Sequence, residues 1–252
     1  MGGIIAIVNQ KGGVGKTTTA VNLTYALHQA GRRVLLCDLD PQANATSGLG
    51  CEKGEDRSSY ELLSEPENAR SCITSTPYGD LIRSGAGLSG AGIELVSVPN
   101  REYRLRDALE TLRVDYDEIF IDCPPSLELL TLNALAAADS ILVPVQCEYF
   151  ALEGLSDLMR TLRAVKAGFN PSLDLFGLVL TMYDGRTNLS YQVSDEVRRH
   201  FPGKVFQTVI PRNIRLSEAP SHGLPVQVYD KQSRGAQSYS ALAAEILAKE
   251  EA

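Results

Sequence analysis

The stretch Lys11-Gly12-Gly13-Val14-Gly15-Lys16-Thr17-Thr18 lies between an apolar run at 4–8 and a helical pattern at 16–30. Its three glycines let the backbone curl so that N–H groups point inward, and the start of the following helix favours an anion. Lys16 can then reach the β- and γ-phosphates of a nucleotide, and the Thr17 hydroxyl can bind Mg²⁺. The pattern predicts a phosphate-binding loop.

This loop departs from the usual G-x-x-x-x-G-K-[ST] spacing. Gln10 stands where the first glycine would fall, and Lys11 is an additional lysine. Because Lys16 already serves the phosphates of its own loop, Lys11 has no evident role in its own site.

Outward from the loop, short apolar runs alternate with helical patterns. Such alternation is typical of βαβ units with a parallel sheet covered on both faces. Right-handed crossovers then predict a doubly wound α/β fold, mostly parallel, with helices on both faces. The expected strands are 4–8, 34–36, 93–98, 118–121, 141–145, 175–181 and a short one near 205–210; the expected helices are 16–30, 101–113, 126–138, 152–167, 189–200 and 235–249.

The chain length favours one large domain. At roughly 150 residues per domain, 252 residues are best explained by a single domain over 1–252. Residues 48–92 are the least regular, with eight glycines and an acidic stretch at 52–67. We expect surface loops there, around a short helix near 58–64, as an elaboration of the domain.

Composition excludes several classes of protein. A hydrophobic share of 44% and a charged share of 22% are ordinary for a globular chain. The net charge of −7 argues against a constitutive nucleic-acid coat, though not against a local basic face. The five cysteines form no C-x-x-C pair, and their odd number, without a secretory leader, suggests a cytoplasmic protein. No apolar run reaches the ~18 residues of a membrane span.

The motifs together resemble one known family. K-G-G-V-G-K-T at 11–17 is similar to the deviant Walker A signature of the ParA/MinD class of ATPases, and further segments resemble the ParA/Soj branch over nearly the whole chain. Only the region around 51–92 lacks a recognisable motif. The segments are D-L-D-P-Q at 38–42, N-A-T-S-G-L-G at 44–50, I-D-C-P-P-S at 121–126, P-V-Q-C-E-Y at 144–149, V-I-P-R-N at 209–213 and L-S-E-A-P-S at 216–221.

The resemblance implies a homodimer that encloses two ATP molecules with Mg²⁺ at its interface. Lys11 would then cross to the partner's nucleotide, where a cation stabilises the charge developing on the γ-phosphoryl group; comparable arginine fingers contribute roughly 10³–10⁵ in rate. Catalytic roles fall to Lys11, Lys16 and Asp40. The expected nucleotide-binding residues are Lys11, Gly12, Gly13, Val14, Gly15, Lys16, Thr17, Thr18, Pro211 and Asn213.

Three carboxylates end predicted strands. Asp38 and Asp40 follow the second strand, and Asp122 follows the run at 119–121, so all three are expected beside the ligand crevice of an open sheet. By resemblance Asp40 positions the attacking water, while Asp38 and Asp122, with Thr17, serve the metal. The alternative is helix capping or turn formation. Gln42 is either a residue of a switch loop or a solvated loop residue.

Two further segments carry expected contacts. Pro211 and Asn213 resemble the part of the family that receives the adenine base, and an asparagine amide can pair with adenine's donor and acceptor edge; ordinary turn chemistry is the alternative. Met182 either packs on the base or belongs to the core.

A basic face is also expected. Residues 186–234 hold eight lysines and arginines against four acidic residues. Charge alone fits a solvated surface, but Arg186 and Arg215 match positions where the family carries DNA-binding arginines. Two phosphate contacts per protomer give a salt slope of about −1.8, and four per dimer about −3.6. This favours sequence-independent binding of double-stranded DNA by the dimer.

The leading hypothesis is a partitioning ATPase of the cytoplasm and nucleoid, stimulated by a ParB-like (Spo0J-type) partner. A MinD-like membrane-associated ATPase would need a basic amphipathic terminal helix, whereas the sequence ends A-K-E-E-A, so no membrane is expected. A reductase or cluster carrier would need paired interface cysteines, but Cys123 and Cys147 are expected in the core. A nucleotide-gated regulator of replication initiation remains an alternative.

Overall fold

The computed structural model describes residues 2–54 and 56–250. They form a seven-stranded sheet in the order β3-β4-β2-β5-β1-β6-β7. Every neighbouring pair is parallel except β3 with β4. The strands are β1 (Gly3–Ile7), β2 (Val34–Asp38), β3 (Ile73–Thr76), β4 (Gly79–Ile82), β5 (Glu118–Asp122), β6 (Ser140–Gln146) and β7 (Asp174–Thr181).

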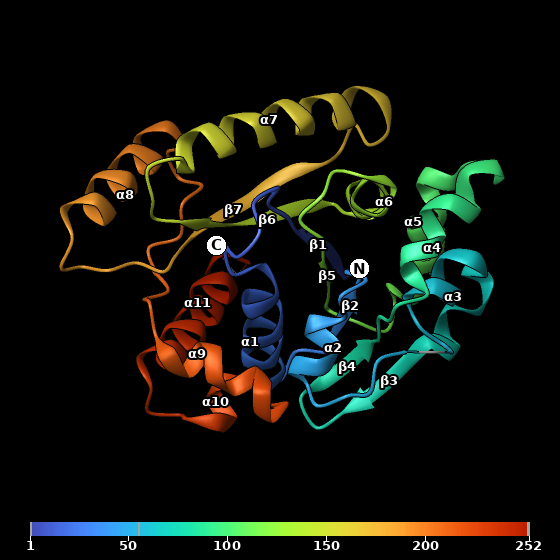
Figure 1. The fold of residues 1–252 in the computed structure, drawn as a ribbon, viewed down its shortest axis with the longest axis horizontal. Helices are drawn as coiled ribbons and strands as arrows, with labels where there is room; N and C mark the ends of the chain where they lie inside the picture. Colours follow the sequence, from blue (N-terminus) through green and yellow to red (C-terminus); the bar gives the residue numbers. More distant parts are fainter. Residues whose placement is uncertain (1, 55, 251–252) are drawn as a thin grey trace.

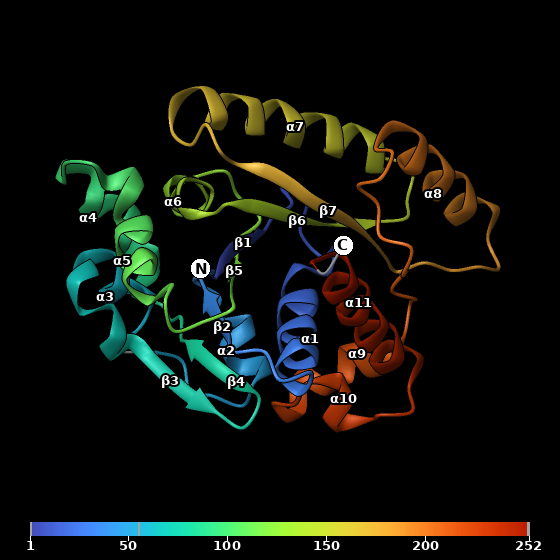
Figure 2. The same ribbon diagram turned by 180° about the vertical axis from the view of Figure 1, so that it is seen from behind.

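Helices cover both faces of this sheet (Figures 1 and 2). Short 3₁₀ helices occur at 66–72, 95–97, 101–103 and 219–222. The α-helices are α1 (Lys16–Gln29), α2 (Asn44–Gly48), α3 (Ser59–Ser64), α4 (Leu88–Glu94), α5 (Arg104–Leu112), α6 (Leu129–Ala137), α7 (Ala151–Gly168), α8 (Asn188–His200), α9 (Ile214–Glu218), α10 (Val226–Tyr229) and α11 (Arg234–Glu250).

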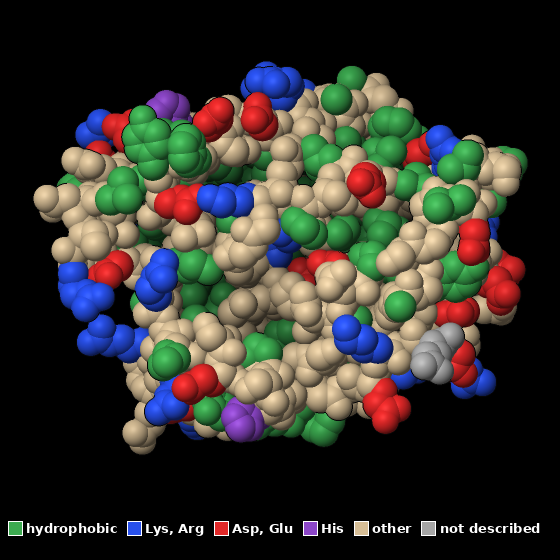
Figure 3. Space-filling view, viewed as in Figure 1, with side chains coloured by type: hydrophobic (Ala, Val, Ile, Leu, Met, Phe, Trp, Pro, Cys, Tyr) green, Lys and Arg blue, Asp and Glu red, His purple; other side chains and the backbone are tan. Residues whose placement is uncertain are grey.

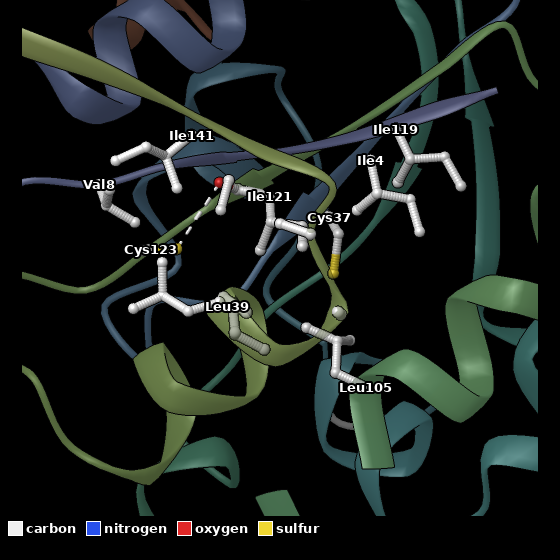
Figure 4. Close-up of a cluster of buried hydrophobic side chains, with 14 of the residues drawn as sticks. Ile4, Val8, Cys37, Leu39, Leu105, Ile119, Ile121, Cys123 and Ile141 are labelled. Carbon is white, nitrogen blue, oxygen red and sulfur yellow. Dashed lines mark hydrogen bonds between the residues drawn. The ribbon is translucent and has the colours of Figure 1, made fainter. Parts of the chain in front are cut away.

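Two hydrophobic cores lie on opposite faces of the sheet because successive strand residues point to opposite sides. Ile4 and Ala6 of β1 pack into the core beneath α5, α6 and α7, part of which is drawn in Figure 4. Ile5 and Ile7 pack into the core beneath α1 and α11. This two-sided burial explains the continuous apolar runs of the central strands, and it confirms the expected doubly wound α/β fold.

The expected strand at 93–98 is wrong. These residues form the end of α4 and a 3₁₀ turn, in which only Leu95 is buried and Ile93 is 80% exposed. The place beside β2 is taken instead by β4, which pairs with it through Leu35–Asp80 to Cys37–Ile82. The run at 93–98 therefore does not occupy the position beside β2.

The region 48–92 is also more ordered than expected. The short helix near 58–64 is confirmed as α3, where Ser58 and Glu61 form a reciprocal capping box. The hairpin of β3 and β4 was missed, because its strands have only four residues each and little apolar alternation.

The expected strand near 205–210 is interrupted. Its residues run along β7 and bond to it at intervals, for example from the Phe206 N–H to the Leu178 carbonyl. The N–H groups of Gln207 and Thr208 instead donate to the carboxylate of Glu245 in α11, at 2.7 and 2.9 Å. The carboxylate of Glu245 thus accepts the hydrogen bonds that backbone carbonyls of a neighbouring strand would accept in a regular sheet.

Candidate functional site

The phosphate loop connects β1 to α1. It lies at the carboxyl end of the parallel strands. Gly13 and Gly15 adopt φ values of 75° and 92°, a region that glycine enters without strain. Gly15 is the N-cap of α1 and supplies no capping side chain, which leaves the helix start suited to an anion. Val14 is buried, and its carbonyl accepts a hydrogen bond from the Thr181 hydroxyl at 2.8 Å. The loop is therefore fixed to the end of β7.

Lys16 lies inside this site, with only 7% of its surface exposed. Its Nζ donates to the backbone carbonyl of Lys11 at 3.1 Å. Burial lowers the pKa of Lys16. The nearby carboxylates of Asp122 and Asp40 favour the charged ammonium and offset part of this decrease. A phosphate would supply the anionic partner that this buried ammonium requires.

The side chain of Lys11 takes a different direction. It is 48% exposed and forms an ion pair with Glu148, which follows β6. The two lysines of the loop are thus separated, one enclosed in the crevice and one held at its outer edge by a carboxylate of the same subunit.

Asp122 ends β5 opposite Asp38 in the sheet register. Both of its carboxylate oxygens are buried without a hydrogen-bond partner among the described residues. Burial raises the pKa of Asp122 well above its usual range, and Asp38 adds to the rise. The nearby Thr17 hydroxyl and the Lys16 ammonium lower the pKa of Asp122 and so offset part of this rise. The Thr17 hydroxyl does not, however, reach normal hydrogen-bond geometry with Asp122. Two unsatisfied carboxylate oxygens fit a hard cation such as Mg²⁺.

The surrounding donors match the way magnesium binds beside nucleotides. Within 2–54 and 56–250, no group of three or more His, Cys, Asp or Glu side chains could hold a metal by itself. Mg²⁺ normally takes one or two carboxylates and completes its shell with water and substrate phosphates. Asp122 and the Thr17 hydroxyl would be the protein's contribution here, and the ion would neutralise phosphate charge.

Asp38 and Asp40 differ in how their oxygens are used. Asp38 Oδ2 accepts from the N–H and hydroxyl of Thr46, at 2.8 and 2.7 Å. Among the described residues, Asp40 Oδ1 accepts from the Gln42 N–H alone, at 2.9 Å, and Asp40 is 7% exposed. Asp38 is thus bonded to the first turn of α2, and its expected role at the metal stays a prediction. Asp40 retains acceptor capacity beside the crevice.

A cavity of about 320 Å³ continues from the phosphate loop. It is bordered by Gly15 and Thr18 on one side and by Pro211 and Asn213 on the other, so the structure brings both predicted nucleotide segments together. Asn213 Oδ1 accepts from the Arg215 N–H at 3.0 Å as the N-cap of α9, which leaves its NH₂ group for a ligand. Met182 also lines the cavity and has a positive φ of 50°.

Arg186 and Arg215 lie on the surface, and each is paired with acids of its own subunit. Asp184 holds Arg186 through both carboxylate oxygens, at 2.9 and 2.8 Å. Arg215 contacts Glu218 at 2.7 Å and Asp230 at 3.2 Å. Arg186 also lines a cavity of about 660 Å³ together with Arg212 and Arg234. Figure 3 shows Lys and Arg side chains gathered around a hollow at the left edge of this view.

Three partners of predicted residues were not assigned from the sequence: Thr46, Thr181 and Glu148. The first two are uncharged side chains, Thr46 within α2 and Thr181 at the end of β7, and nothing in a single sequence pairs them with Asp38 or Val14. Glu148 lies within the quoted segment at 144–149, but its contact with Lys11 joins residues 137 positions apart. Spatial contacts of this kind leave no periodic signal.

The cysteines are all free. Cys123 and Cys147 are 1% and 7% exposed, as expected for core thiols, and burial raises the pKa of both. Neither is presented on the surface as a cluster ligand would be.

Comparisons with known proteins place these features in a family. A family model described as an AAA domain matches residues 2–175. The chain is 55% identical to the sporulation initiation inhibitor protein Soj of Bacillus subtilis, over 98% of this chain and 99% of that protein. It is 52% identical to the chromosome partitioning protein ParA of Myxococcus xanthus, over 99% of this chain and 89% of that protein.

A solved structure extends the similarity to the whole fold. It is described as cobyrinic acid a,c-diamide synthase from Mycobacterium smegmatis with bound ADP and magnesium, and it matches with a TM-score of 0.87 at 37% identity, over 100% of this chain and 96% of that one. The two Soj and ParA proteins have the higher identity. With its additional Lys11 in the phosphate loop and its mostly parallel sheet, the chain belongs to the ParA/Soj family of P-loop ATPases.

Proposed function

We propose that this partitioning ATPase binds ATP with Mg²⁺, dimerises around the two nucleotides and then binds double-stranded DNA without sequence preference. Hydrolysis, stimulated by a ParB-like partner, returns it to the free monomer. The names of its relatives support the partitioning role, and the ADP and magnesium of the solved homologue support the cofactors. Residues 1–252 act as one ATPase domain, since both cores share a single sheet.

The observation that carries this proposal is the separation of the two loop lysines. Lys16 is enclosed in its own crevice, whereas the Lys11 ammonium lies at the rim in contact with Glu148. A lysine at the rim can reach a second subunit's triphosphate by exchanging one anionic partner for another. Dimerisation and phosphoryl transfer would then depend on the same ammonium group.

Within the site the remaining residues have distinct roles. The N–H groups of 12–18 and Lys16 bind the phosphates, and Pro211 with Asn213 receives the base. Asp122 and Thr17 hold Mg²⁺, Asp38 orders α2 through Thr46, and Asp40 orients the attacking water.

DNA binding by the dimer follows from the arrangement of the arginines. Arg186 and Arg215 are each paired with carboxylates in the free subunit, so phosphate must displace those acids. Exposed ion pairs contribute at most about 1 kcal/mol, which makes the exchange feasible but weak for one subunit. Two subunits joined by ATP present twice the contacts at a high effective concentration.

No helix within 2–54 and 56–250 has the length and apolar content to span a bilayer. We propose the nucleoid as the site of action.

Sedimentation with fluorescent duplex DNA of unrelated sequences tests the proposal. With ATP and Mg²⁺ the protein should move with every duplex, and with ADP it should not. Binding that is equal in ADP and ATP would contradict nucleotide control. Retention by liposomes in place of DNA would favour the membrane-associated alternative.

A further inference from the structure

The loop that carries Asp40 lies between the ends of two neighbouring strands. β2 pairs in parallel with β5 on one side and with β4 on the other (Figure 1). Because neighbouring parallel strands run in the same direction, the residues that follow them emerge at the same end of the sheet. The residues directly after β4, at 83–85, are therefore placed beside the loop after β2. They belong to the region 48–92, for which no motif predicted a role.

Ser84 reaches this loop through its side chain. Its hydroxyl donates to the backbone carbonyl of Asp40 at 2.7 Å, and no part of Ser84 is exposed. The same carbonyl accepts from the Ala43 N–H at 2.8 Å, which closes a turn over 40–43. On the side of β5, the Leu39 N–H donates to the Asp122 carbonyl at 3.0 Å. The backbone around Asp40 is thus held from both neighbouring strands.

The backbone of Ser84 is bonded to the same loop. The Ser84 N–H donates to the Thr46 hydroxyl at 2.9 Å, and that hydroxyl donates to Asp38 Oδ2 at 2.7 Å. Thr46 and Asp38, like Ser84, have no exposed surface. Hydrogen bonds in such a buried network are strong and hold one geometry, because water does not compete for their donors and acceptors. Ser84 therefore contacts Asp40 directly and Asp38 through Thr46.

The residues before and at the start of α3 hold Ser84 in turn. The Gly54 N–H donates to the Ser84 carbonyl at 2.8 Å, and the Ser59 N–H donates to the Arg83 carbonyl at 2.8 Å. The Ser59 hydroxyl, which is also buried, donates to the backbone carbonyl of Asp38. Ser84 thus has a fixed position from which its hydroxyl can act on the loop.

We propose that Ser84 is a positioning residue for ATP hydrolysis, whose hydroxyl fixes the backbone of Asp40 so that the Asp40 carboxylate is aimed at the attacking water. The carbonyl that Ser84 binds and the carboxylate that orients water belong to one residue, so a shift of this peptide group moves the carboxylate. A misplacement of about 1 Å at a reacting group can cost on the order of 10²-fold in rate. This inference rests on the proposed function, because the effect of Ser84 is transmitted by Asp40.

Two substitutions remove the hydrogen bond with little risk to the fold. In Ser84→Ala the Asp40 carbonyl keeps its bond from Ala43, so this buried acceptor is not left without a partner. The melting temperature should therefore fall by at most about 2–4 °C. Ser84→Cys keeps nearly the same side-chain volume, but its thiol donates only weakly. It checks that the lost hydrogen bond, and not a cavity, causes the effect.

Thr24→Val is the matched control. Thr24 is buried in α1, and its hydroxyl donates to the Ala20 carbonyl at 2.7 Å. The substitution therefore also removes a buried hydroxyl that is bonded to a backbone carbonyl, but at a residue outside the nucleotide site.

Phosphate release is measured over a series of ATP concentrations with Mg²⁺ and duplex DNA. Ser84→Ala and Ser84→Cys should lower kcat by about tenfold or more, while the KM for ATP stays within about twofold of the wild-type value. Their ATP-dependent dimers should form normally and stay on DNA longer than those of the wild type, because hydrolysis is the step that releases them. Thr24→Val should match the wild type in kcat, KM and time on DNA.

A double variant tests whether Ser84 acts through Asp40. In the Asp40→Ala background, Ser84→Ala should cause no further fall in the single-turnover rate, because the group that Ser84 positions is already gone. Residues that act as a unit show such non-additive effects. An effect of Ser84 on the fold alone would lower the rate by the same factor in both backgrounds.

Three results would overturn the inference. An unchanged kcat in Ser84→Ala and Ser84→Cys would show that the hydroxyl does not position Asp40. A fall in rate that is equally large with and without Asp40 would place the effect of Ser84 elsewhere. Normal turnover in Asp40→Ala alone would refute the catalytic role of Asp40 in the proposed function, and this result is recognised before any Ser84 variant is compared.

Discussion

Lys16 donates a hydrogen bond from its Nζ to the backbone carbonyl of Lys11, at 3.1 Å. The lysine that serves the phosphates thus bonds to the main chain of the lysine that points away, toward Glu148. A phosphate that draws the Lys16 ammonium toward itself would release the Lys11 carbonyl. The arrangement gives nucleotide binding a direct physical route to the residue expected to cross between subunits.

Replacing Asp40 should separate binding from hydrolysis. Asp40→Ala removes the acceptor expected to orient water but leaves Lys16 and Asp122 in place. Turnover should fall by about 10²-fold or more, while the ATP-dependent dimer persists on DNA. Phosphate release and DNA co-sedimentation measure the two properties. Asp56→Ala, an exposed carboxylate outside the site, is the control. Normal turnover in Asp40→Ala would remove its catalytic role.

Arg215 should matter for DNA and not for the dimer. Arg215→Ala removes one phosphate contact per subunit, so the dependence of log affinity on log salt should become shallower by about 1.8 for a dimer. Arg70→Ala makes the same charge change outside the basic stretch 186–234, at a residue paired with Asp115, and should leave the slope unchanged. Titrations of duplex DNA at several salt concentrations check this. An unchanged slope for Arg215→Ala would move the DNA-binding face elsewhere.

The thiols should differ in reactivity. Four of the five cysteines are buried and only Cys51 is partly exposed. Burial raises the pKa of Cys147 to about 11, so its thiolate is scarce at pH 8. A thiol reagent should therefore label one cysteine per folded chain quickly and all five after denaturation. Cys51→Ser should abolish the fast phase, and rapid labelling that survives this change would show that the core opens.

Asp117 should contribute a pH-dependent part of the stability. Its hydrogen bonds from Arg33 lower its pKa to about 2, below the unfolded value of about 4. The stabilisation is therefore present above pH 4 and is lost as the pH falls from 4 toward 2. Because solvent screens this pair, Asp117→Asn should lower the melting temperature by only about 1–3 °C at pH 7. A difference that persists at pH 2 would exclude the ion pair as its source.

Strong periodic signals predicted most of the fold. The strands β1, β2, β5 and β6, and the second half of β7, are buried on both faces, and such burial leaves continuous apolar runs in the sequence. The hairpin of β3 and β4 was missed because its strands are short, no residue of β3 is buried and only half of β4 is. The run at 93–98 misled because it is apolar although two of its side chains, Ile93 and Val96, are exposed and only Leu95 is buried.

The site was predictable where one local stretch carries the chemistry. The loop 11–18 and the carboxylates at the strand ends could be predicted from residue spacing and from the geometry of a parallel sheet. The contact of Lys11 with Glu148 joins distant segments, and that of Thr46 with Asp38 depends on how the loop after β2 folds back. The hydrogen bonds from Thr46 to Asp38 also show that one of the three carboxylates contacts α2, a difference that spacing alone does not predict.

The central claim is that Lys11 joins two subunits through their nucleotides, and sedimentation velocity tests it most directly. Wild type and Lys11→Ala are compared in ADP and in ATP with Mg²⁺. The wild type should double its mass in ATP only, and Lys11→Ala should bind ATP yet remain a monomer. A wild type that stays monomeric in saturating ATP, or a Lys11→Ala variant that dimerises equally well, would contradict the account.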